Sequence, residues 1–72
     1  MFRNLKAEMA RQGLTGKQIA VAIGISEKAF SNRMSGRTEF LMGELIAIRE
    51  TFFRNLDIGY LFFEMHEEVD LL

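Results

Sequence analysis

The sequence predicts an all-α fold, a compact domain of five helices, and two observations carry this prediction. Apolar residues recur at spacings of three and four rather than two, which is the period of helices buried along one side. Proline, which would break helices, is absent. Apolar residues make up 49% of the 72 residues, enough for one core, and without cysteine hydrophobic packing has to hold the fold.

Glycine and threonine mark the ends of the first two helices. Gly13 and Gly24 can adopt the positive φ that terminates a helix, and Thr15 between them is a suitable N-cap for the second helix. The apolar residues expected to face the core from these helices are Phe2, Leu5, Met9, Ile19, Ala20 and Ile23.

A third helix is expected from Ser26 to Ser35. Ser26 is its N-cap, Glu27 lies in the first turn where the helix dipole favours a negative charge, and Gly36 closes it. The residues expected to face the core are Ala29, Phe30 and Met34. The opposite face is polar and consists of Glu27, Lys28, Ser31, Asn32 and Ser35.

Two further helices follow a loop at residues 37–39. The fourth carries an apolar stripe at the i, i+4, i+7 and i+11 positions, and Asp57 caps the fifth. The core residues expected from these helices are Leu41, Leu45, Ile48, Phe52, Ile58, Leu61, Phe62 and Met65. Residues 1–66 are thus predicted to form the domain, and residues 67–72 an acidic tail.

Aromatic residues exceed what one inner stripe of these two helices can bury. Phe53, Tyr60 and Phe63 lie off the predicted stripes. Exposed aromatic residues indicate an interface, whereas buried ones would simply enlarge the core, and the sequence leaves both alternatives open.

The charge is unevenly distributed although the net charge is only −1. Residues 1–37 contain seven basic side chains against two acidic ones, and residues 38–72 contain two against eight. One part of the molecule can therefore approach a polyanion that the other part would repel.

Residues 15–37 resemble the helix-turn-helix of the phage repressor and Cro family, also called XRE-like. The marks of the resemblance are Ala20 where two helices cross, Gly24 four residues later at the turn, and the core residues Ile25 and Phe30. The likeness continues through residues 39–40, 48–53 and 56–62. It implies a lambda-repressor-like DNA-binding fold and a short prophage-type transcription regulator, most often a repressor.

The resemblance places the third helix in the major groove of DNA. The positions that it makes candidate base readers are Glu27, Lys28, Ser31 and Asn32, and the candidate phosphate contacts are Thr15, Lys17, Ser35 and Arg37. The side-chain chemistry agrees, since Lys can donate to guanine, Asn can pair with adenine and Glu can accept from cytosine. Taken alone, such a polar face is usually only solvated, and Lys17 and Arg37 could equally be solubilising charges.

The chain departs from the family at three places. Gly16 stands where a phosphate-contacting Gln is usual. Arg33 replaces a common apolar residue and is expected to extend toward solvent or phosphate. Met9 and Met34 occupy positions at which many relatives carry an Arg–Glu pair, so an apolar contact is expected there.

Other classes of function find less support in the sequence. No catalytic set can be assembled, and His66, the single histidine, has no Cys partner for a metal, so neither an enzyme nor a cofactor is expected. The expected partners are double-stranded DNA and a second copy bound through helices four and five, in the cytoplasm, with no membrane and no small-molecule substrate. The alternative is an antitoxin-like adaptor, a protein-interaction module on the same scaffold. The acidic second half of the chain favours this alternative.

Overall fold

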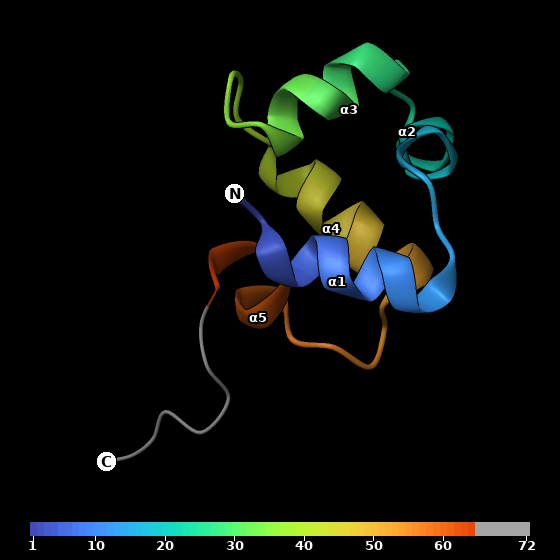
Figure 1. Ribbon diagram of the computed structural model, residues 1–72, viewed down its shortest axis with the longest axis vertical. Helices are drawn as coiled ribbons and strands as arrows, with labels where there is room; N and C mark the ends of the chain where they lie inside the picture. Colours follow the sequence, from blue (N-terminus) through green and yellow to red (C-terminus); the bar gives the residue numbers. More distant parts are fainter. Residues whose placement is uncertain (65–72) are drawn as a thin grey trace.

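The computed structural model describes residues 1–64 and confirms the all-α prediction, since this part of the chain contains helices and no strand. Figure 1 shows their arrangement. The five helices are α1 (Arg3–Gln12), α2 (Gly16–Ile23), α3 (Glu27–Met34), α4 (Met42–Phe52) and α5 (Ile58–Phe63).

The helices pack in a series of neighbours. Within residues 1–64, α1 packs on α5, α5 on α4, α4 on α2, and α2 on α3. Helix α3 therefore lies at one end of the series, at the top of Figure 1, away from α1 and α5. This position leaves the side of α3 that carries Glu27, Lys28 and Ser31 open to solvent.

Local signals set the helix ends as predicted. Gly13 and Gly24 take φ values of 68° and 80° after α1 and α2. The Thr15 hydroxyl accepts a hydrogen bond from the Gln18 N–H at 3.1 Å, and the Gln18 side chain accepts one from the Thr15 N–H at 2.8 Å. This capping box satisfies backbone donors that the first turn of α2 would otherwise leave unpaired. Ser26 and Asp57 cap α3 and α5 in the predicted way.

The core confirms most of the predicted inner stripes. Its buried apolar members are Leu5, Ile19, Ala20, Phe30, Met34, Leu45, Ile48, Phe53, Leu61 and Phe62. Met9 packs half-buried against this cluster, which contains Met34. Met9 is therefore partly and Met34 largely withdrawn from solvent, which agrees with the apolar environment that the sequence predicts for both.

Helix α4 corrects one prediction and decides a question that the sequence left open. Leu41, expected in the inner stripe, is the N-cap residue and is 64% exposed. Phe53, for which an interface and an enlarged core were both open, is only 2% exposed and belongs to the core. Phe53 follows the last helical residue and leaves the helical path at φ −137° and ψ 47°, so helical spacing no longer decides where its ring points. Phe63 is 55% exposed, as anticipated for a surplus aromatic.

Tyr60 also proves to be structural rather than surplus. Its hydroxyl donates a 2.8 Å hydrogen bond to the carboxylate of Glu8, which is the buried charged residue of α1. The Arg11 guanidinium, which is itself exposed, pairs with the same carboxylate oxygen. These contacts join α1 to α5 around a charge that is compensated from two sides.

The start of α1 is joined to the end of α5. The Arg3 N–H donates to a Glu64 carboxylate oxygen at 3.3 Å, and the two side chains form an ion pair. The predicted roles of Met65, His66 and the tail at residues 67–72 lie outside the described residues. None of the helices in residues 1–64 combines the length and the apolar character that crossing a membrane requires.

Candidate nucleic-acid interface

Helix α3 is a short helix with well-defined ends. The Ser26 hydroxyl accepts a hydrogen bond from the Ala29 N–H at 3.0 Å, and Glu27 lies in the first turn. At the other end Gly36 takes a φ of 84°, and the Arg37 N–H donates to the Asn32 carbonyl at 2.9 Å. The loop after α3 is thus tied back onto the last turn of the helix.

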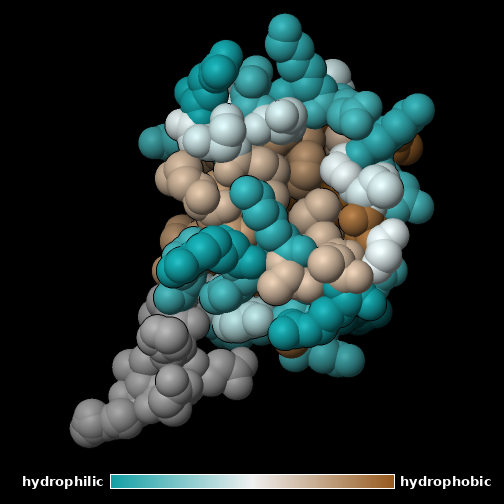
Figure 2. Space-filling view, viewed as in Figure 1, coloured by the Kyte–Doolittle hydropathy of each residue, from teal (hydrophilic) through white to brown (hydrophobic). Residues whose placement is uncertain are grey.

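One side of α3 is anchored in the core and the other faces solvent. Phe30 and Met34 are buried, whereas three of the four candidate base readers, Glu27, Lys28 and Ser31, are exposed. The fourth, Asn32, is half-buried. Figure 2 shows hydrophilic side chains along α3 at the top of the view, above the more hydrophobic centre.

The four candidate phosphate contacts lie at the start of α2 and at the end of α3. Lys17 and Arg37 are exposed cations. The Thr15 hydroxyl is engaged in the cap of α2, and the Ser35 hydroxyl donates to the Asn32 carbonyl at 3.1 Å. Both hydroxyls are therefore engaged in hydrogen bonds within the protein, and Lys17 and Arg37 remain as the charged candidates for contact with phosphate.

Gly16 has a structural reason for its small size. A Cβ atom at this position would lie 3.1 and 3.2 Å from Cδ2 and Cε2 of the Phe30 ring. The ring is buried and has little room to move aside. A side chain at position 16 would therefore press on this ring, which is the structural reason for a small residue at the start of α2.

Arg33 does not extend toward solvent or phosphate, which corrects the sequence prediction. Its Nε and Nη2 atoms donate to the two carboxylate oxygens of Glu44 at 2.8 and 3.1 Å. The side chains of Arg33 and Glu44 are only 18% and 12% exposed. The sequence analysis did not predict this pair. One signal was present, because Glu44 lies three residues after the N-cap of α4, where a Glu typically caps the first turn of a helix.

The ion pair changes the charge that α3 and its surroundings present. With Arg33 neutralised by Glu44, the exposed cations on this side are Lys17, Lys28 and Arg37, set against Glu27. The net charge of these exposed residues remains positive. Glu8, the other acidic residue of the first half of the chain, lies enclosed between α1 and α5. The excess of basic residues in the first half of the chain is thus smaller at the surface than the sequence suggests.

Known proteins add no identification. Comparisons with protein-family models, with curated proteins and with solved structures returned no match. Among residues 1–64, no three His, Cys, Asp or Glu side chains gather as they would around a metal ion. The functional argument therefore rests on the residues and the geometry of α3.

Proposed function

We propose that the protein binds double-stranded DNA sequence-specifically through α3 and acts as a cytoplasmic transcriptional repressor. One observation carries the proposal: α3 is anchored in the core by Phe30 and Met34 and presents Lys28 and Ser31 to solvent, with Asn32 beside them. A helix held along one side and carrying hydrogen-bonding groups on the other has the form that the major groove admits.

The surrounding cations supply affinity without sequence preference. If Lys17 and Arg37 each neutralise one phosphate, the affinity of one protomer falls roughly 12-fold between 50 and 200 mM salt. Each base contact that forms a good bidentate pair adds about 1–3 kcal/mol of discrimination between sequences. The phosphate contacts therefore hold α3 on the duplex and the base contacts select the site.

The test is a selection of bound duplexes from random DNA at low salt. The parent is compared with the variant Lys28→Ala/Asn32→Ala, which removes two candidate base readers. A matched control, Lys6→Ala/Asn55→Ala, removes the same two residue types from exposed positions on α1 and on the α4–α5 connection. Circular dichroism establishes that all three proteins are folded.

The expected result is a motif that the parent and the control enrich and that the α3 variant loses. Equal loss in the control would mean that binding depends on overall charge rather than on α3. A parent that enriches nothing would refute the proposal.

A single α3 reads few base pairs, so the proposal includes a homodimer that sets two such helices about 34 Å apart. Met42 and Ile46 are 58% and 47% exposed and one turn apart on α4, and the exposed Phe63 ends α5. Exposed apolar residues on these two helices favour self-association. Sedimentation equilibrium should show a dimer at high micromolar concentration, and a strictly monomeric mass would refute this part.

A second candidate is an antitoxin-like adaptor that binds a protein. The observation that favours it is a groove of about 800 Å³ between the first residues, the α3–α4 loop and the end of α5. Its walls include Phe2, Phe40, Phe62 and Phe63. Binding in such an apolar groove would depend little on salt, whereas DNA binding weakens steeply as salt rises.

A further inference from the structure

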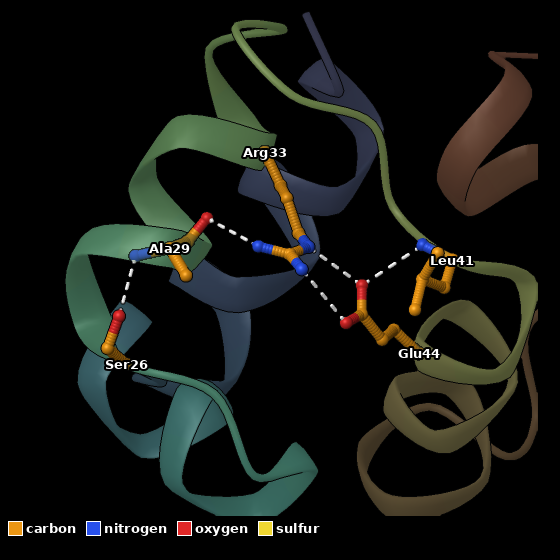
Figure 3. Close-up of polar contacts among 5 residues, drawn as sticks. All are labelled: Ser26, Ala29, Arg33, Leu41 and Glu44. Carbon is orange, nitrogen blue, oxygen red and sulfur yellow. Dashed lines mark hydrogen bonds and ion pairs between the residues drawn. The ribbon is translucent and has the colours of Figure 1, made fainter.

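The pair of Arg33 and Glu44 bridges α3 and α4 (Figure 3). Two donors of the guanidinium meet the two oxygens of the carboxylate at 2.8 and 3.1 Å, a bidentate geometry that fixes both position and orientation. Both side chains are largely withdrawn from water. Solvent and salt therefore screen this pair less than they would screen an exposed one.

Each partner is also tied to the backbone of its own helix. The Arg33 Nη1 donates to the Ala29 carbonyl at 3.2 Å, one turn back along α3. One oxygen of Glu44 accepts from the Leu41 N–H at 3.0 Å, at the start of α4. The connection thus runs from the backbone of α3, at the Ala29 carbonyl, through the Arg33 guanidinium and the Glu44 carboxylate to the Leu41 N–H at the start of α4 (Figure 3).

Apart from this pair, α3 is held by α2 and by its own buried side chains. Among the helices of residues 1–64, the backbone of α3 comes close only to that of α2, and Phe30 and Met34 reach into the core. These apolar contacts hold the inner side of α3, and the pair of Arg33 and Glu44 adds a directional polar link from α3 to the start of α4. The link sits at Arg33, directly after the candidate base reader Asn32.

We propose that Arg33 and Glu44 are positioning residues that hold α3 at the angle needed to read DNA, and this inference rests on the proposed function. Glu44 then raises the affinity for DNA although its charge repels phosphate. The opposite arrangement is that Arg33 is itself a phosphate ligand, with Glu44 competing for it. When the charge of Glu44 is removed, the first arrangement predicts a lower affinity for DNA and the second predicts a higher one.

The test compares Glu44→Gln with Glu50→Gln in the full chain, using the duplex selected by the parent. Both variants remove one negative charge from α4, and Glu50 is exposed. A glutamine at position 44 still accepts from the Leu41 N–H, so the cap of α4 is kept. Affinity is measured over a range of salt concentrations.

The expected result is a gain of at most about twofold in affinity for Glu50→Gln, because the change removes distant repulsion and frees Arg49 and Arg54 near the end of α4, away from the link between Arg33 and Glu44. Glu44→Gln should lose about fivefold or more, the scale of a modest coupling between sites, with an unchanged salt slope. If Glu44→Gln instead binds more tightly and its salt slope steepens by about one, Arg33 contacts phosphate and the proposal is overturned.

Amide hydrogen exchange without DNA separates this inference from the proposed function. In Glu44→Gln the Arg37 N–H, which closes the end of α3, should exchange faster than in Glu50→Gln, while the amides of α1 and α5 stay unchanged. Unchanged exchange at Arg37 would overturn the link between the helices even if the parent binds DNA. If the exchange at Arg37 differs between the two variants as expected but the parent binds no duplex, the link between the helices stands. The role of this link in reading DNA is then overturned together with the proposed function.

Discussion

The substitution Tyr60→Phe removes one hydroxyl and tests how α5 is held to α1. Phenylalanine fills the same space, so the change removes only the 2.8 Å hydrogen bond to Glu8, whose side chain is 12% exposed. A hydrogen bond to a charged group contributes about 1.5–3 kcal/mol. Because Arg11 still pairs with the same carboxylate, we expect a loss of about 2 kcal/mol in the free energy of unfolding.

The assay is urea denaturation followed by circular dichroism, together with a thermal melt. For a domain of this size, a loss of about 2 kcal/mol lowers Tm by about 8–16 °C. In a Glu8→Gln background, where the acceptor is neutral, Tyr60→Phe should cost only about 1 kcal/mol. If Tyr60→Phe changes the unfolding free energy by less than about 0.5 kcal/mol in the parent, the hydrogen bond does not hold α5 to α1 as argued.

Three further predictions concern local structure. Gly16→Gln should lower the unfolding free energy by about 1–3 kcal/mol in urea denaturation, because the new Cβ meets the buried ring of Phe30. The hydrogen bond from the Arg3 N–H, aided by the guanidinium charge, holds the pKa of Glu64 below its ordinary value of 4.5. Its ionised form therefore stabilises the fold above that value, and the contribution is lost as the pH falls through the lowered pKa, which an NMR titration of the carboxyl carbon would follow. Thr15→Ala should cost about 1 kcal/mol in the same denaturation assay by removing the cap of α2.

Each of these predictions has a matched comparison. Gly43→Ala places a Cβ on α4 with nothing within 4 Å, so it should leave stability equal or higher, and equal losses at Gly16 and Gly43 would contradict the steric argument. A titration midpoint for Glu64 at or above 4.5 would mean that its contact with Arg3 does not persist in solution. Thr15→Ser keeps the hydroxyl and should retain most of the stability that Thr15→Ala loses.

The sequence predicted which residues of α3 face solvent at the candidate interface, but it did not predict the net charge of that surface. The faces of α3 could be assigned from spacing, because a helix places residues three and four apart on the same side. The exposure of Glu27, Lys28 and Ser31 and the burial of Phe30 and Met34 agree with that assignment. The engagement of Arg33 could not be predicted, because its partner lies 11 residues away across a loop whose path the spacing of residues does not reveal.

Local sequence signals were enough to predict five helices and most of their ends, because capping residues and glycines act on backbone groups within three or four positions. The ends of α4, which no such residue marks, were not predicted. Thr15 and Gly24 needed no knowledge of the rest of the chain. Which polar side chains are enclosed depends on contacts between distant parts of the chain, since Glu8 meets Tyr60 across 52 positions. Such pairs form when packing brings distant helices together and removes water, so their stabilisation depends on the whole fold rather than on any local pattern.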